Sequence, residues 1–285
     1  MTLVSIVVPC YNLGAFLVEA VESALGQTYA AVEVIVVDDG STDPETIRVL
    51  EQADWPRARI VRKQNGGCPS ALNAAVALAR GRYILALSAD DRVHPDYVRQ
   101  AVEVLKARGE VGIVYCSAEF FGDRTGPWQL PDYSRDEMAH GNVIPVTAMF
   151  RRDDWEKVGG FNEEAVLGLE DWDLWLRVIS LPREVVKLEQ VLFYYRIRYD
   201  SATMQMAQDP LRTAKAQAVV FRNNIGFFSQ HAEAFFAHHN ELESEVWTLR
   251  TEVRRWKWVT GRLDRLSRRH PRAAERASRV RRWRR

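Results

Sequence analysis

Short apolar runs alternate with amphipathic stretches along the first half of the chain. The runs are rich in Val and Ile and are bounded by turn residues: 4–9, 32–38, 58–63 and 83–87. Runs of this length and composition are typical of buried strands. Between them, apolar positions recur at helical spacing over residues 16–25, 45–53, 70–79 and 95–108. This order predicts an α/β fold, with a mostly parallel sheet flanked by helices.

From about residue 204 the strand pattern stops and a helical extension is expected. Apolar side chains then recur at spacings of four, three, four and three, at Leu242, Val246, Leu249, Val253 and Trp256, with Leu263 one heptad later. This spacing predicts a short coiled-coil seam of about three heptads, interrupted at Thr260. Two outcomes are open: the helix docks on its own domain, or it forms a homodimer through the C-terminal helix.

The length of 285 residues allows one large domain with an appendage. We expect a main domain over 1–203, a helical extension over 204–240, and a coiled-coil-like, basic amphipathic tail over 241–285. No apolar run approaches the roughly 18–20 residues of a membrane-spanning helix, which argues against a synthase that extrudes its own polymer. Three widely spaced cysteines form neither a disulfide framework nor a zinc pattern. The sequence therefore predicts a cytoplasmic protein.

The net charge of +1 hides an uneven distribution. Residues 250–285 contain 15 Arg and Lys against 3 Asp and Glu, whereas residues 1–249 contain 24 against 35. A basic, Trp-containing tail suits peripheral contact with an anionic membrane, at the inner face if the protein is cytoplasmic. The alternatives are a solvated disordered tail and non-specific nucleic-acid binding. Nucleic acid ranks last, because no nucleic-acid-binding fold accompanies the charge.

Polar and acidic residues follow three of the predicted strands. Pro9-Cys10-Tyr11-Asn12 ends the first, Asp38 to Asp43 the second, and Ser88-Ala89-Asp90-Asp91 the fourth. Such residues can simply form turns and cap the next helix, as Ser41 or Asp43 could. Three clusters at one sheet edge favour a binding site, because ligands of open α/β sheets bind outside the carboxyl ends of the strands. So many carboxylates also predict a cation or a positively charged ligand among them.

Several motifs follow one another along the chain: Val4 to Asn12, Glu33 to Asp43, Asn65-Gly66-Gly67, Ala79 to Ile84, Ala89-Asp90-Asp91, Gly159 to Glu163 and Glu170-Asp171-Trp172-Asp173-Leu174-Trp175. In this order they resemble the motifs of family 2 glycosyltransferases. The resemblance spans residues 3–203. It implies a GT-A fold, a nucleotide-sugar donor with uridine favoured, a divalent metal (Mn²⁺ or Mg²⁺) and inversion at the anomeric carbon.

The resemblance assigns the donor site residue by residue. Pro9 and Tyr11 match positions that line the nucleobase pocket, where the Tyr11 ring would stack on the base. Asp39 matches the carboxylate that reads the base or the ribose, and Asp38 is expected to brace the loop. The family's D-x-D element falls on Ser88-Ala89-Asp90, so Ser88 replaces the usual first Asp at the ribose. Asp90 remains as the metal ligand, and Asp91 is expected to assist it.

For the chemistry, the resemblance points to Asp171 as the general base that deprotonates the acceptor hydroxyl. Glu170 and Asp173 compete for this role, and all three acids could instead cap the helix 170–180. Arg196 and Arg198 are candidates for holding the diphosphate, although a solvated loop would also explain them. Many relatives carry a His near position 198, and this chain does not.

The sequence therefore predicts a metal-dependent inverting glycosyltransferase acting on a glycan or lipid-linked acceptor, in cell-surface polysaccharide or glycoconjugate synthesis. The rival interpretation, motivated by Ser88 and the missing His, is a catalytically silent relative that binds nucleotide sugars or acts as a scaffold. No glycine-rich phosphate loop follows any predicted strand, which weighs against a dinucleotide dehydrogenase, a P-loop NTPase and a sugar-nucleotide pyrophosphorylase.

Overall fold

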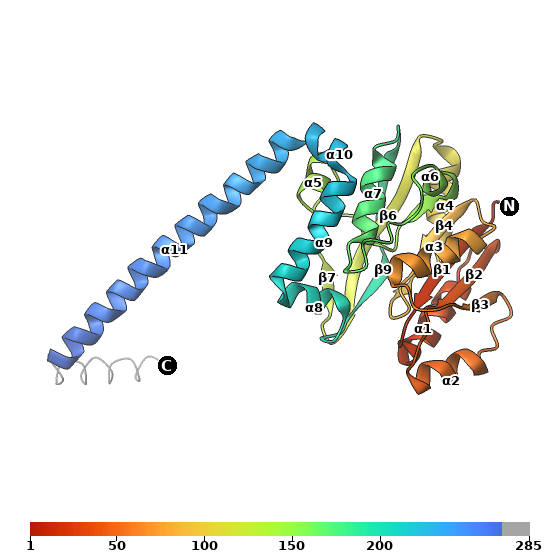
Figure 1. Ribbon diagram of the computed structural model, residues 1–285, viewed down its shortest axis with the longest axis horizontal. Coiled ribbons are helices and arrows are strands. Elements are labelled where there is room, and N and C mark those ends of the chain that lie inside the picture. Colours follow the sequence, from red (N-terminus) through yellow and green to blue (C-terminus); the bar gives the residue numbers. More distant parts are fainter. Residues whose placement is uncertain (270–285) are drawn as a thin grey trace. The chain divides into compact units, whose positions relative to one another are not determined.

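The computed structural model describes the backbone of residues 1–269 and the side chains of residues 1–257. Its N-terminal half has four parallel strands in the order β3 (Ala58–Arg62), β2 (Val32–Asp38), β1 (Val4–Cys10) and β4 (Tyr83–Ala86) (Figure 1). The crossover helices are α1 (Gly14–Leu25), α2 (Pro44–Gln52) and α3 (Cys68–Leu78). The predicted α/β alternation of this half is confirmed.

The second half of the sheet is mixed. It continues from β4 through β8 (Met149–Arg151), β6 (Val111–Gly122) and β9 (Glu184–Ile197) to β5 (Arg92–Val93), and β7 (Gly126–Trp128) pairs with β6. The β4–β8, β8–β6 and β9–β5 pairs are antiparallel, whereas β6 and β9 run parallel. The long strand β9 therefore returns the chain toward the edge where β4 ends.

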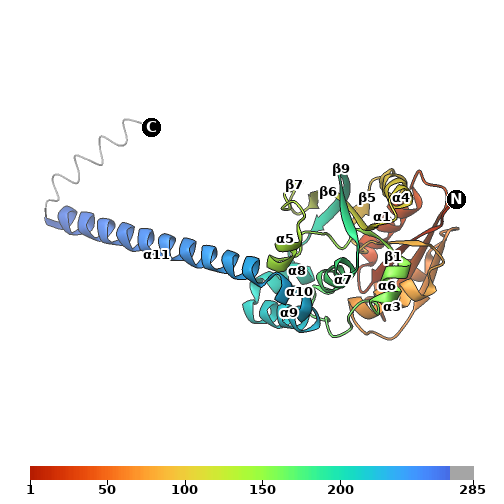
Figure 2. The same ribbon diagram turned by 90° about the horizontal axis from the view of Figure 1, so that it is seen from above.

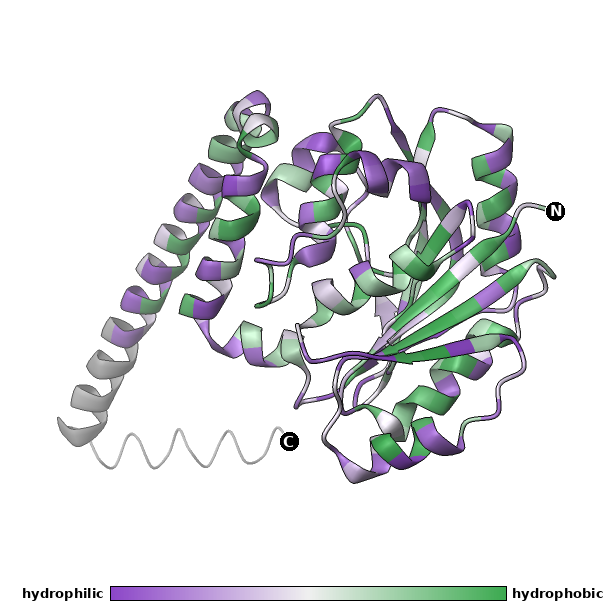
Figure 3. Cartoon of the chain, turned by 45° about the vertical axis from the view of Figure 1, so that its right-hand side comes forward, coloured by the Kyte–Doolittle hydropathy of each residue, from purple (hydrophilic) through white to green (hydrophobic). Residues whose placement is uncertain are grey.

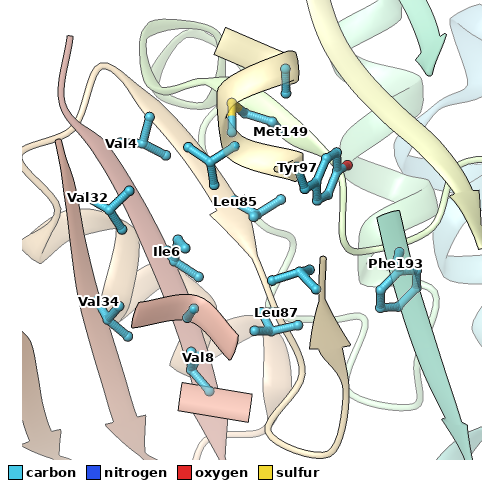
Figure 4. Close-up of a cluster of buried hydrophobic side chains, with 14 of the residues drawn as sticks. Val4, Ile6, Val8, Val32, Val34, Leu85, Leu87, Tyr97, Met149 and Phe193 are labelled. Carbon is cyan, nitrogen blue, oxygen red and sulfur yellow. The ribbon is translucent and has the colours of Figure 1, made fainter. Parts of the chain in front are cut away.

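Helices cover both faces of the sheet. In Figure 2, α1 and α4 (Tyr97–Ala107) lie on one side, and α3 and α6 (Arg152–Lys157) lie on the other. Apolar residues dominate the central strands (Figure 3), because these strands are buried on both faces. The α1 and α4 face contains a core in which Val4, Ile6 and Val8 pack with Leu85 and Tyr97 (Figure 4).

The remaining helices follow β7 along the chain, and several helices begin at a capping side chain. They are α5 (Arg135–His140), α7 (Glu170–Ile179), α8 (Ala202–Gln208), α9 (Pro210–Asn223), α10 (Ile225–Gln230) and α11 (Ala232–Arg269). The Asp43 carboxylate caps α2 by accepting from the Thr46 amide at 2.8 Å, and Asp209 caps α9 in the same way. The predicted helical C-terminal extension is confirmed by α8 to α11.

The chain divides into two compact units, Met1–Ala232 and Glu233–Arg285. The second unit consists, as far as it is described, of helix α11 from Glu233 onward, and this helix passes through Thr260 without a break. Over the described residues, none of the helices combines the length and apolarity needed to cross a membrane. The basic tail predicted from the sequence lies partly outside the described residues, from position 270 onward.

Candidate functional site

The carboxyl ends of β1, β2 and β4 meet at one edge of the sheet, because β1 lies between the other two. Cys10 is in register with Asp38, and the Asp39 amide donates to the Cys10 carbonyl at 2.8 Å. Tyr11, directly after β1, is 46% exposed, so its ring is open to a ligand. The structure thus brings together the three strand-end segments that the sequence singled out.

Pro9 and Ser88 frame this edge from two strands. Pro9 lies within β1, half-buried, one residue before its end. Ser88 follows β4 and is also half-buried, and its carbonyl accepts from the Asp91 amide at 3.1 Å. The segment 88–91 is therefore a tight turn that places Asp90 and Asp91 beside each other.

Asp38 and Asp39 are both buried, and the carboxylate of each accepts hydrogen bonds from a different set of donors. Asp38 accepts from the Ser41 amide at 2.8 Å and forms an ion pair with Arg62, so it braces the loop after β2. Asp39, 2% exposed, accepts from Lys63 Nζ at 2.8 Å and from the amides of Gly66 and Gly67. It fixes the loop before α3, and Lys63 adds a positive charge that sequence reasoning missed.

Gly67 needs its glycine for conformational reasons. Its φ of +87° lies in the left-handed region, which residues with a side chain rarely adopt. This conformation lets the Gly67 amide donate to Asp39 Oδ2 at 2.8 Å while the next residue, Cys68, begins α3. The Gly66-Gly67 pair quoted in the family resemblance is therefore a carboxylate-binding turn.

Arg196, at the end of β9, and Arg198, just after it, lie beside the acids that follow β4. Arg198 Nε lies 3.0 Å from Asp90 Oδ2, and both side chains are largely buried. The Arg196 amide donates to Asp91 Oδ1 at 2.8 Å, and its guanidinium donates to the Asp90 carbonyl and pairs with Glu19. Arg198 thus contacts the Asp90 carboxylate through its guanidinium, whereas Arg196 contacts the Asp91 carboxylate through its main-chain amide.

Asp90 and Asp91 differ in burial and in the causes that raise their pKa. Burial raises the pKa of Asp90, and the Arg198 charge opposes that rise. Burial, and then the charge of Asp90, raise the pKa of Asp91 well above its usual range. Asp91 is 1% exposed, so its place is behind Asp90, where it anchors β9.

Asp171 lies in the first turn of α7, after Leu169, whose φ of +68° is uncommon for a residue with a side chain. Its Oδ1 accepts from the Trp172 amide at 2.7 Å, and its Oδ2 accepts from Asn142 Nδ2 at 2.8 Å. Burial, together with the neighbouring charge of Glu170, raises the pKa of Asp171 to about 7. Asn142 orients this carboxylate and was not found by sequence reasoning.

Glu170 and Cys68 connect α7 to the loop that Asp39 holds. The pKa of Glu170 is raised by burial, and the Cys68 thiol at the start of α3 hydrogen-bonds its carboxyl. Desolvation by the surrounding protein raises the pKa of that thiol, although part of Cys68 is exposed, and the charges of Glu170, Asp171 and Asp39 add to the rise. Cys68 therefore lies between the strand-end edge and the acids of α7.

Asp173 is bound on both oxygens by structural partners. Its Oδ2 accepts from Arg177 at 2.6 Å, and its Oδ1 accepts from Asn223 Nδ2 at 2.7 Å and from Asn224 Nδ2 at 3.0 Å. It is completely buried and ties α7 to the end of α9. Of the three acids on this turn, Asp171 and Glu170 remain partly exposed.

Tyr195 on β9 is influenced by both groups of acids. Burial raises the pKa of Tyr195, the charges of Asp91, Asp90 and Asp171 add to the rise, and a hydrogen bond to Thr203 opposes it. The Tyr195 hydroxyl donates to Thr203 Oγ1 at 3.1 Å. This tyrosine, also missed from the sequence, is close enough to both groups of acids for their charges to act on its hydroxyl.

A divalent cation has few protein ligands here. Within residues 1–257, no three His, Cys, Asp or Glu side chains are grouped so that they could hold a metal. In the same part of the chain, Asp91 Oδ2 is buried without a hydrogen-bond partner, and Asp90 is paired only with Arg198. Mg²⁺ and Mn²⁺ commonly bind one or two carboxylates together with substrate phosphates. The acids therefore fit a cation for which a bound diphosphate supplies further ligands.

Residues 5–167, more than half of the chain, match the family described as Glycosyl transferase family 2. A chondroitin synthase of Escherichia coli is 37% identical over 183 residues, which cover 62% of this chain and 26% of that protein. An uncharacterised glycosyltransferase of Rickettsia typhi is 31% identical over 266 residues, covering 85% of this chain and 82% of the relative.

The first curated relatives are much longer proteins, and the match covers 18% to 26% of their lengths. Among solved structures, TarS of S. aureus (residues 1–349, with UDP-GlcNAc) matches with a TM-score of 0.67 at 20% identity, covering 83% of this chain and 72% of that one. The mannosyltransferase PcManGT of Pyrobaculum calidifontis, in complex with GDP-Man and Mn²⁺, matches with a TM-score of 0.56 at 20% identity, covering 84% and 75%. The fold is thus of the predicted GT-A type, and the chain belongs to glycosyl transferase family 2.

Proposed function

We propose that this chain is an inverting glycosyltransferase. It moves one sugar from a UDP-linked donor to a hydroxyl of a glycan or lipid-linked acceptor, in the synthesis of cell-surface polysaccharide or glycoconjugate. Membership of the family supports the transferase class. The similarity to a chondroitin synthase supports a polysaccharide product, and the similarity to a structure with UDP-GlcNAc supports the donor class.

The observation that carries this proposal is the placement of Asp171. Its carboxyl has a pKa of about 7 and is oriented by Asn142, and its charge, like that of Asp90, acts on Tyr195. A general base works best when its pKa lies near the operating pH. In the proposed reaction the acceptor oxygen gives its proton to Asp171 and forms a bond to the anomeric carbon. The bond from that carbon to the diphosphate oxygen breaks on the opposite face, which inverts the configuration.

The strand-end edge is the proposed donor site. Tyr11 stacks on the base beside Pro9, Asp39 and Ser88 contact the base or ribose, and Arg196 and Arg198 hold the diphosphate. A divalent ion held mainly by Asp90, with Asp91 behind it, would stabilise the negative charge that develops on the leaving diphosphate. Arginine suits the same task because its planar guanidinium can clamp phosphate oxygens.

The test is sugar transfer or donor hydrolysis with a panel of UDP-sugars and Mn²⁺, comparing the wild-type chain with Asp171→Asn. Loss of a general base lowers the rate by roughly 10²–10⁴-fold. The exposed Asp153 of α6 provides the matched control, Asp153→Asn, which should keep the wild-type rate. A wild-type rate in Asp171→Asn would show that Asp171 is not the base.

A second candidate function is a catalytically silent nucleotide-sugar binding protein or scaffold. Ser88 stands where the family resemblance implies an Asp, and Arg198 forms an ion pair with Asp90, the expected metal ligand. Calorimetric titration with UDP, GDP and dTDP, each with and without Mn²⁺, separates the candidates. Metal-dependent binding without turnover of any donor would favour the silent relative, and measurable turnover would exclude it.

We also propose that the basic C-terminal region makes peripheral contact with an anionic membrane, where lipid-linked acceptors are found. Its 15 basic against 3 acidic residues over 250–285 support this location. Co-sedimentation with vesicles that contain anionic lipid, compared with neutral vesicles, measures the contact. Equal binding to both vesicle types would contradict it.

A further inference from the structure

One exposed feature takes no part in the proposed transfer reaction: an apolar stripe along α11. Its members are Leu242, Val246, Leu249, Val253 and Trp256, whose side chains are between 43% and 68% exposed. The stripe follows one side of the helix because the spacings alternate between four and three residues. Large apolar side chains gathered on one exposed helix face indicate an interaction surface.

The stripe has the residue types of a two-stranded coiled coil. In a heptad labelled a to g, Val246 and Val253 occupy a, whereas Leu242, Leu249 and Trp256 occupy d. A β-branched residue at a with Leu at d favours two parallel strands over three or four. Trp247, also exposed, falls at b on the outer side and lies outside this seam.

The charges beside the stripe select the partner and its direction. Both g positions in this stretch are acidic, Glu245 and Glu252, and the e positions that follow them are basic, Arg250 and Lys257. In a parallel, in-register pair, each g residue lies beside the e residue of the next heptad of the partner helix. Glu245 then meets Arg250, and Glu252 meets Lys257, twice per dimer. In an antiparallel pair, acidic g positions would face each other, which is unfavourable.

We propose that residues 242–257 of α11 pair with the same residues of a second copy of this chain, in parallel and in register. The partner of the stripe is thus another α11, because the charges that flank the seam of Val and Leu are complementary between two copies. The two Met1–Ala232 units then join the paired helices at the same end. This inference goes beyond the proposed transferase function and does not depend on it.

The first experiment is sedimentation equilibrium of the full chain over a wide concentration range. We expect a monomer–dimer equilibrium in the wild type and at least about 100-fold weaker association in Leu249→Asp, because each dimer loses two buried leucines. Thr251→Asp, at the outer f position of the same heptad, is the matched control and should associate like the wild type. Circular dichroism checks that both variants keep their helix.

The second experiment tests direction. In a Cys68→Ser background only the buried Cys10 and Cys116 remain of the native thiols. Val253→Cys then places a thiol at an a position, which faces its own copy only in a parallel, in-register pair. Oxidised glutathione, which accepts the two thiol hydrogens, should convert this variant to a disulfide-linked dimer. Thr251→Cys, on the outer face, should stay uncrosslinked.

Each result decides the proposal. A wild type that is monomeric at every concentration overturns it, including the case in which it binds anionic vesicles as a monomer. A dimer that Leu249→Asp leaves unchanged places the interface elsewhere. A dimer in which Val253→Cys does not crosslink is antiparallel or out of register. Association that weakens with added salt, together with the crosslink, supports the parallel pairing.

Discussion

Opposing influences meet at Asp171. The first turn of a helix favours a negative charge, because the amide dipoles point their positive ends there. Burial and the adjacent Glu170 act the other way and prevail, raising the pKa of Asp171 to about 7. Because the base must be ionised, we expect kcat/KM to rise about tenfold per pH unit below this pKa and to level above it. A pH profile of sugar transfer measures this directly.

Two neighbours should move that profile in opposite directions. Glu170→Gln removes a negative charge, so the pKa of Asp171 should fall and the rise in rate should shift to lower pH. Asn142→Ala removes a donor to the ionised carboxylate at 2.8 Å, so the pKa should increase and the rise should shift to higher pH. Profiles that stay in place in both variants would show that another group titrates.

Arg198 forms ion pairs with two carboxylates, Asp90 and Asp200, and we expect a bound donor to replace the first of them. It pairs with Asp90 at 3.0 Å, and a diphosphate would compete for the same guanidinium. We expect Arg198→Ala to weaken UDP binding by about 10–100-fold, the usual size for a charged hydrogen bond. Arg198→Lys should recover part of this loss. Calorimetry with UDP and Mn²⁺ is the measurement, and unchanged affinity in Arg198→Ala would place the diphosphate elsewhere.

Among single residues, those that the sequence singles out are the ones whose neighbours along the chain form a motif. Tyr11, Asp39 and Asp90 follow strands, and their placement depends mainly on the order of parallel strands. Lys63 and Asn142 were missed because their roles depend on contacts with distant residues. Asn142 reaches Asp171 across 29 positions, and no local pattern distinguishes it from any other loop asparagine.

Among the elements, α7 shows why three acids in one turn could not be told apart from the sequence. Glu170, Asp171 and Asp173 all suit a helix start. Only the packing of α9, whose end supplies Asn223 and Asn224, makes Asp173 structural. The second half of the sheet was unpredictable for a similar reason. The pairing of β6 with β9 joins segments about 70 residues apart. The half from β3 to β4 is wholly parallel as expected, whereas in the second half β6–β9 is parallel and β4–β8, β8–β6 and β9–β5 are antiparallel.

The stability of the α7–α9 junction should therefore depend on the Asp173 carboxylate. In Asp173→Asn an amide group replaces one acceptor oxygen and faces donors from Arg177 or the two asparagines. Breaking a buried pair in this way costs roughly 3–5 kcal/mol, so we expect the Tm to fall by several degrees. Thermal unfolding checks this, with Asp153→Asn as control. A Tm equal to that of the control would mean that the junction contributes little.

For the whole molecule, the division between Ala232 and Glu233 separates the proposed catalytic and pairing functions. Every residue described at the candidate site, from Pro9 to Asn224, belongs to the first unit. The end of its last helix, α10, is held by a hydrogen bond between His231 Nδ1 and Asp136 Oδ1 at 2.7 Å. A chain that ends at Ala232 keeps this contact and the full core around β1.

We therefore expect residues 1–232 to fold alone and to bind UDP with Mn²⁺ as tightly as the full chain. The same truncation should abolish dimer formation, because the seam from Leu242 to Trp256 is removed. Calorimetry and sedimentation of the two chains measure the two properties separately. Loss of UDP binding on truncation would mean that α11 or its pairing completes the donor site. Dimers of the truncated chain would instead place the interface in the first unit, because a chain that lacks the interface cannot associate through it.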